Sequence, residues 1–167
     1  METTQEFHDF TLSVLEKQSR CYEELLALAQ EQREQLLAGR VRTLDDIVDR
    51  QSEIMGRAAH LDRQADSCLT RLKGALHLDS DPITLAAVAA AAPDHYATRY
   101  RELCARLREL SDEIRRTSLG NLELARNALS YIDFSLRLIG AGEDSAAYAA
   151  DGMPAPPNAR TLMDHRA

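Results

Sequence analysis

Tryptophan is absent from this chain of 167 residues, and the other aromatic residues are three phenylalanines and five tyrosines. Leucine, alanine, arginine and glutamate are abundant instead. Such a composition disfavours a β-sandwich or a β-barrel and favours helices. An all-α fold is therefore the first expectation.

No apolar run approaches the roughly 18 residues of a membrane span, and the N-terminal residues Met-Glu-Thr-Thr-Gln-Glu do not resemble a secretory signal. The formal net charge is −7. No segment is a basic block, which disfavours nucleic acid and membrane insertion. Cys21, Cys68 and Cys104 lie far apart without a Cys-x-x-Cys motif. They are predicted to be reduced, buried thiols of a cytoplasmic protein.

Residues 94–139 are predicted to form one long helix, around which the rest of the chain is organised. Its apolar or small residues alternate at spacings of four and three, the seam that coiled-coil packing requires. This seam consists of Tyr96, Tyr100, Leu103, Leu107, Leu110, Ile114, Thr117, Asn121, Leu124, Ala128, Tyr131, Ser135 and Leu138. From Leu122 onward a second apolar column lies beside it: Leu122, Ala125, Leu129, Ile132, Leu136 and Ile139. The apolar face therefore widens toward the end of the helix, and a broad apolar face must be covered.

Two further long helices are predicted at 3–38 and 44–76, and the short connection makes them antiparallel neighbours. The first carries a stripe of Phe7, Phe10, Val14, Cys21, Leu25 and Leu28, and Gly39 ends it. Thr43 is expected to cap the second, with Asp46 in a weak capping box. The seam of the second helix is Ile47, Gln51, Ile54, Ala58, Leu61, Ala65, Cys68 and Leu72.

A short, alanine-rich helix is predicted at 83–92, started by Asp81-Pro82 and ended by Pro93. The sequence leaves open whether it is docked or mobile. After Gly140-Ala141-Gly142 too little apolar area remains for folding, so residues 141–167 are predicted to be a disordered tail. The expected fold is thus an elongated antiparallel helical hairpin or three-long-helix bundle at 1–140, followed by a flexible C-terminal tail. A monomer and a homodimer both fit.

Motifs of catalysis and metal binding are missing. No acidic residue is followed by histidine three positions later, and no two histidines lie within a helical turn. There is no phosphate-binding glycine loop and no Gly-x-Ser-x-Gly. We expect no enzyme, no metal and no cofactor. Asn121 is the polar residue of note, either as a buried asparagine that fixes the register of the seam or as part of a groove floor.

The segment from Asn121 to Leu129, followed by an apolar helix, a glycine break and then Tyr148 and Gly152, resembles the C-terminal part of the FlgN family of flagellar export chaperones. The segment Leu44-Asp45-Asp46-Ile47-Val48 and the helix around Val88 also resemble this family. The resemblance covers nearly the whole chain.

The resemblance implies a cytoplasmic chaperone without ATPase activity. It would bind C-terminal helical segments of the two hook–filament junction proteins, its clients, and deliver them to the type III export gate. The implied client-binding residues are Leu119, Asn121, Leu122, Ala125, Leu129, Ile132, Leu136 and Ile139. Tyr148 and Gly152 are the implied contacts with the export gate receptor. A generic helical adaptor unrelated to secretion is the alternative.

Two partners could cover the widened apolar face. A client helix could lie on it, or residues 25–37 of the first helix could close against it within the chain. We expect both in part, with the last two or three turns of the long helix half covered in the absence of a client.

Overall fold

The computed structural model describes residues 4–78 and 83–147, with side chains up to Ile139. In chain order the elements are α1 (Thr4–Leu37), the 3₁₀ turn η1 (Val41–Thr43), α2 (Leu44–Ala75), α3 (Leu85–Ala91) and α4 (Asp94–Ala147). The described residues contain no strand, so the predicted all-α fold with three long helices and one short helix is confirmed. The chain divides into two compact units, Met1–Ala125 and Arg126–Ala167.

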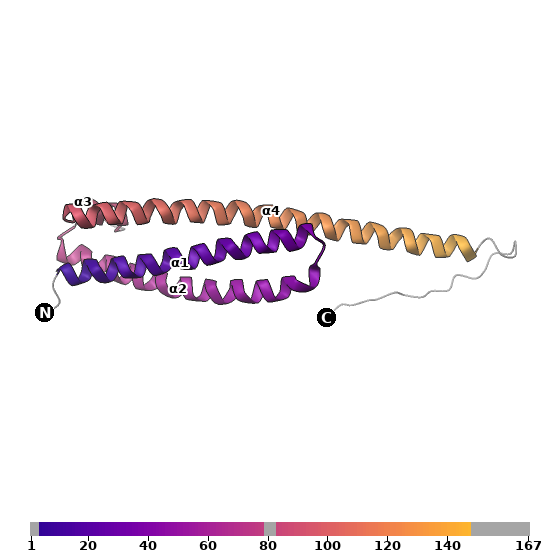
Figure 1. Ribbon diagram of the computed structural model, residues 1–167, viewed down its shortest axis with the longest axis horizontal. Coiled ribbons are helices and arrows are strands. Elements are labelled where there is room, and N and C mark those ends of the chain that lie inside the picture. The colour runs from indigo at the N-terminus through magenta and orange to yellow at the C-terminus, as the bar shows by residue number, and fades with distance from the viewer. Residues whose placement is uncertain (1–3, 79–82, 148–167) are drawn as a thin grey trace. The chain divides into compact units, whose positions relative to one another are not determined.

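In the first unit α1 packs against both α2 and the first part of α4 (Figure 1). Partners on α1 and α2 run in opposite directions, as predicted for neighbours joined by a short turn. Partners on α1 and α4 run in the same direction. The pairs that show this are Gln18–Asp62, Glu24–Arg57 and Glu31–Arg50 between α1 and α2, and His8–Tyr100 and Ala29–Asn121 between α1 and α4.

The predicted seams of α2 and of the first part of α4 are confirmed. Every residue of the α2 seam is buried or half-buried, and Leu72 has no exposed surface. The same holds for the α4 seam from Tyr96 to Leu124. Spacings of four and three keep one side of a helix against its neighbour, so these seams form the core with Val14, Leu15 and Leu28 of α1.

The predicted stripe of α1 is incomplete, and Phe10 was wrongly assigned to it. The Phe10 side chain is 51% exposed, whereas the polar residues His8, Thr11, Gln18 and Ser19 are buried. Because α1 contacts a helix on each of two sides, it needs two seams. A search for one apolar stripe misses the second seam, which contains polar residues.

The two ends of the α1–α2 connection differ in how well they were predicted. Gly39 has a φ of +67° just after the last residue of α1, which is the left-handed conformation expected of a C-terminal glycine. Thr43 does not cap α2 with its side chain. Its hydroxyl donates to the carbonyl of Arg40 instead, at 2.9 Å. The cap prediction was wrong because η1 places Thr43 in a 3₁₀ turn with helical dihedral angles.

The alanine-rich helix is docked in the structure. Val88 has no exposed surface, and Ala89 is buried in the same core cluster. The hydroxyl of Thr84 accepts a hydrogen bond from the Ala87 amide, so the helix starts after a threonine cap. The expected start at Asp81-Pro82 lies outside the described residues.

α4 runs to Ala147 and thus passes the Gly140-Ala141-Gly142 sequence at which we expected it to end. Residues 141–147 of the predicted tail are helical, and residues 148–167 lie outside the described residues. The division into a bundle at 1–140 and a disordered tail stays a prediction.

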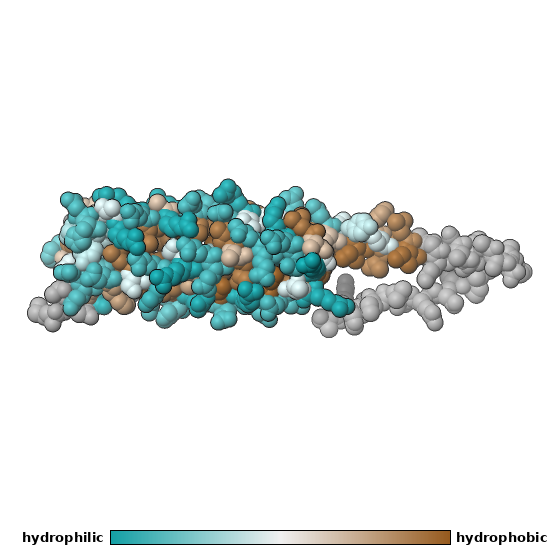
Figure 2. All heavy atoms as spheres, in the orientation of Figure 1, coloured by the Kyte–Doolittle hydropathy of each residue, from teal (hydrophilic) through white to brown (hydrophobic). Residues whose placement is uncertain are grey.

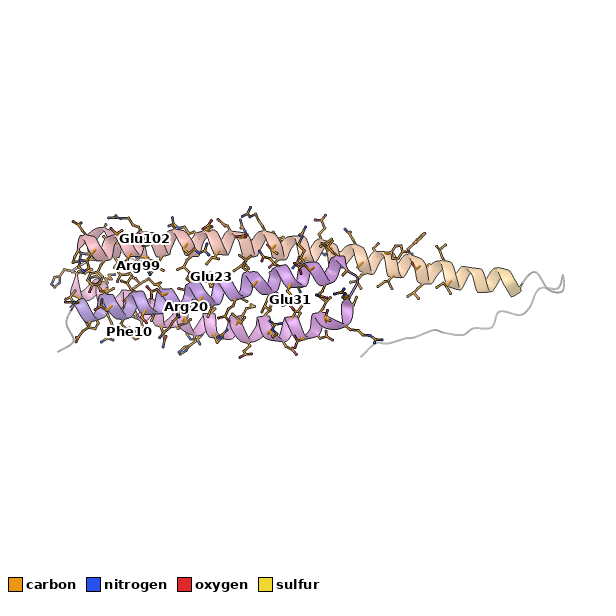
Figure 3. All side chains as sticks on the ribbon, in the orientation of Figure 1. Phe10, Arg20, Glu23, Glu31, Arg99 and Glu102 are labelled. Atoms are coloured by element: carbon orange, nitrogen blue, oxygen red, sulfur yellow. The ribbon has the colours of Figure 1, made fainter. Side chains whose placement is uncertain are left out.

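Arginines of α4 bind glutamates of α1 beside the seam. Arg99 binds Glu16 at 2.7 Å, and Arg106 binds Glu23 at 3.2 Å. Figure 3 shows Arg99 of α4 extending toward α1. These side chains are about half exposed, so each pair contributes at most about 1 kcal/mol of stability. These ion pairs favour one orientation of α4 against α1 rather than adding much to stability.

Near the start of α1 the imidazole of His8 is almost fully buried. Its Nδ1 lies 3.0 Å from the hydroxyl of Tyr100, and its ring stacks on Tyr96 with centroids 4.6 Å apart. Its Nε2 has no hydrogen-bond partner among the described residues. Burial lowers the pKa of His8 below the usual 6.5; the carboxylate of Asp9 raises it to a smaller degree, and His95 lowers it.

Near the C-terminal end of α1, Asn121 of α4 is 3% exposed. Its Nδ2 donates to the Ala29 carbonyl at 2.7 Å and to Oε1 of Gln32 at 3.1 Å. Its Oδ1 is buried, and no group in the described part of the chain donates to it. This geometry supports the buried asparagine that fixes register.

The buried His8 leads to a pH-dependent stability. The folded-state pKa is lowered, so below pH 6.5 the unfolded chain binds more protons than the folded chain. The contribution of His8 is complete above pH 6.5 and is lost as the pH falls through and below that value. Urea unfolding at pH 7.5 and pH 5.5 measures the free energy of unfolding. Between these two pH values it should fall less for His8→Gln than for wild type. The matched control His60→Gln, at an exposed position, should lose as much as wild type; equal losses for all three proteins would contradict the prediction.

Replacing Asn121 should raise stability. The Ala29 carbonyl already accepts a helical hydrogen bond within α1, so Asn121→Leu leaves no carbonyl unpaired and removes the orphan Oδ1. We expect the free energy of unfolding in urea to rise by about 1 kcal/mol. A fall of that size would show that the amide hydrogen bonds outweigh the burial of Oδ1.

Candidate functional site

The candidate site is the exposed apolar surface of α4 in the second unit. Four aliphatic side chains one helical turn apart form what we call the aliphatic face. Each is about half exposed or more: Leu129 (66%), Ile132 (48%), Leu136 (63%) and Ile139 (63%). In Figure 2 hydrophobic side chains gather over the described part of α4 nearest the grey atoms. The sequence predicted that these residues form an apolar face and that they are only half covered in the absence of a client.

The predicted site residues in the first unit differ in how exposed they are. Leu119 and Leu122 are exposed, Ala125 is half-buried, and Asn121 is buried against α1. Beside Asn121, a Cβ added to Gly120 would lie 2.8 Å from Nη1 of Arg33, the flexible end of a side chain that extends from α1 to this point. Asn121 therefore serves the packing of the first unit, whereas Leu119 and Leu122 are accessible.

A second group of exposed apolar residues in the second unit was not assigned to the site. It consists of Tyr131 (73%), Phe134 (59%) and Leu138 (59%), and we call it the aromatic face. Tyr131 and Leu138 belong to the predicted seam, so their spacing could have identified them. Phe134 belongs to neither column, and its hydrophobicity was the one available signal.

Tyr148 and Gly152, the implied contacts with the export gate, lie outside the described residues. Their role stays a prediction.

The described residues contain no group of three or more His, Cys, Asp or Glu side chains that could hold a metal ion. All three cysteines are free, and burial raises the pKa of the Cys68 thiol, which favours the unreactive neutral form.

A groove between α1 and α2 has a volume of about 650 Å³. Its floor includes Cys21 and Leu61, and its rim mixes basic and acidic side chains: Lys17, Arg20, Arg57, Glu24 and Glu53. A rim of mixed sign gives little charge to select a ligand. The α4 faces are the stronger candidates.

A search of the described residues finds no helix that combines the length and the apolar character of a membrane span.

Comparisons with known proteins agree with this picture. A family model described as FlgN protein matches residues 9–156. Comparisons with curated proteins and with solved structures find no match. The family match covers most of the chain, from the start of α1 to beyond the end of α4. The chain therefore belongs to the FlgN family, a family of flagellar export chaperones.

Proposed function

We propose that this protein is a cytoplasmic chaperone that binds C-terminal helical segments of the hook–filament junction proteins. It keeps these clients from premature assembly and delivers them to the type III export gate. It acts by binding alone, without an enzymatic step or a cofactor. The family supports the coarser role, since FlgN chaperones bind flagellar hook-associated proteins.

The observation that carries the proposal is the aliphatic face. Exposed apolar side chains are normal when scattered singly, but a contiguous row of them marks an interaction surface. The face has the i, i+3, i+7, i+10 spacing that receives the apolar side of an amphipathic helix. Because these side chains are only half to two-thirds exposed, each one that a client buries would contribute roughly 1–2 kcal/mol of hydrophobic free energy.

A generic helical adaptor would also use an apolar face of this kind. The two functions differ in the C-terminal tail, since a delivery chaperone needs a second contact that is separate from the client. Tyr148 and Gly152 are our candidates for that contact with the export gate receptor. An adaptor requires no such contact.

The substitutions Leu129→Asp and Ile132→Asp should abolish client binding. Each places a carboxylate where the client helix would exclude water, and burying an unpaired charge costs several kcal/mol. Isothermal titration calorimetry against a purified C-terminal fragment of a hook–filament junction protein measures the loss. We expect at least a hundredfold rise in Kd with an unchanged far-UV circular dichroism spectrum.

Ser130→Asp is the matched control, because it introduces the same charge at an exposed position beside the aliphatic face. It should bind the client with nearly wild-type affinity. If Leu129→Asp or Ile132→Asp unfolds the protein, these residues belong to its own core, and the proposed client surface is wrong.

Deletion of residues 148–167 should separate binding from delivery. The truncated chain keeps the aliphatic face, so its affinity for the client fragment should match that of the full chain. Secretion of the hook–filament junction proteins into the culture medium should fall to background levels, with Tyr148→Ala giving a partial loss. Normal secretion by the truncated chain would favour the adaptor; the full chain expressed at the same level is the control.

A further inference from the structure

The second unit presents two apolar faces rather than one. Successive residues of a helix are rotated by about 100°, which places the centres of the aliphatic and aromatic faces about 150° apart. A polar stripe separates them on one side and carries the ion pair Asp133–Arg137, at 2.7 Å. The residues of this stripe are Arg126, Ser130, Asp133 and Arg137.

One partner helix cannot cover both faces. A packed helix typically buries a stripe somewhat wider than 100° on its neighbour, and the two faces together span more than 200°. A client helix on the aliphatic face would leave Tyr131, Phe134 and Leu138 largely in water. A second element is therefore needed to cover the aromatic face.

The aromatic face continues a seam that is already used for packing. Tyr131 and Leu138 follow at intervals of seven residues from Tyr96, Leu103 and Leu110, which are buried in the first unit. This is the same heptad position, and in the first unit it faces a helix. The expected occupant of the aromatic face is accordingly a helix as well.

The column of α4 that binds glutamates of α1 changes in character along the helix. In the first unit Arg99 and Arg106 lie beside the seam and bind Glu16 and Glu23 of α1. Counting on by sevens passes three residues that are not basic and reaches Phe134. This position of the second unit therefore offers an apolar ring and no cation. The occupant should carry an apolar residue at that point.

A second copy of this chain is disfavoured as the occupant because the exposed stretch of α4 is short. The exposed stretch 126–139 is about 21 Å long at 1.5 Å per residue, or two heptads, whereas a sustained coiled coil needs at least three or four. Two such stretches alone would bury less than the 1,200–2,000 Å² of a standard interface. A client that adds helices to both faces buries roughly twice as much on one copy.

We propose that the aromatic face binds a second helical segment of the same client, so that the client holds residues 126–139 of α4 between two of its helices. This inference rests on the proposed function and adds the mode of client binding.

The test compares two probes on the full-length chaperone. One is a C-terminal fragment of a hook–filament junction protein that contains its last two helical segments, and the other is a synthetic peptide of the last segment alone. Leu129→Asp changes the aliphatic face and Phe134→Asp the aromatic face, with Ser130→Asp as the control in the polar stripe. Calorimetry gives Kd for each pair, and circular dichroism verifies folding.

We expect each face variant to raise the Kd of the two-segment fragment at least tenfold. The Kd of the single-segment peptide should rise with one of the two variants and stay unchanged with the other. If Phe134→Asp leaves both probes unchanged while Leu129→Asp weakens them, the inference is overturned and the proposed function stands. If neither variant changes the Kd of either probe, both the inference and the proposed function are contradicted. A homodimer in light scattering that Phe134→Asp dissociates would also overturn the inference, because the occupant would be a second copy.

Discussion

The packing of the first unit depends on α1, because both α2 and α4 lie against it. This shared role sets a limit that follows from helix length. Asn121 of α4 binds Ala29 and Gln32 of α1, and α1 ends at Leu37, about a turn and a half later. α4 continues to Ala147. The apolar residues of α4 after Ala125 belong to the second unit and are exposed.

Buried polar groups determine where that limit falls. The pair His8–Tyr100 fixes α4 on the first turns of α1, and Asn121 fixes it near the last turns. A coiled-coil seam of Leu and Ala alone would tolerate a shift by one heptad, which is about two helical turns and would bring Ala128 opposite Ala29. The amide of Asn121 opposes this shift because it would leave its hydrogen bonds unmade. Register, set at a cost in stability, thus decides how much of α4 is left exposed.

The sequence predicted most of this architecture, and the failures have physical reasons. The seams of α2 and of α4 up to Leu124 were correct because each helix packs on one side there, which four-three spacing detects. α1 was read incompletely because two neighbours share it, and its second seam contains His8, Thr11 and Gln18 rather than leucines. The docking of α3 could not be decided from its sequence because alanine gives little information about burial. The end of α4 was misplaced because glycine weakens a helix without stopping it.

The candidate site was likewise predicted in one part and missed in another. The aliphatic face was predicted, because a second apolar column beside a seam has a visible period. The aromatic face was overlooked because Tyr131 and Leu138 were assigned to a seam within the chain, and a seam was assumed to be covered. Exposure depends on the length of the neighbouring helix, which a periodic pattern within α4 does not contain. Phe134 belongs to neither apolar column, so its significance emerges from its exposure.

The change from arginine to phenylalanine in this column bears on selectivity. Surface ion pairs such as Arg106–Glu23 contribute little stability, yet they distinguish one partner helix from another. A helix whose glutamates match Arg99 and Arg106 is disfavoured beside Phe134, where desolvation of its carboxylate is not compensated. The same column therefore favours glutamates on the partner of the first turns of α4 and an apolar residue beside Phe134. We expect the partner of the second unit to carry an apolar residue at that position.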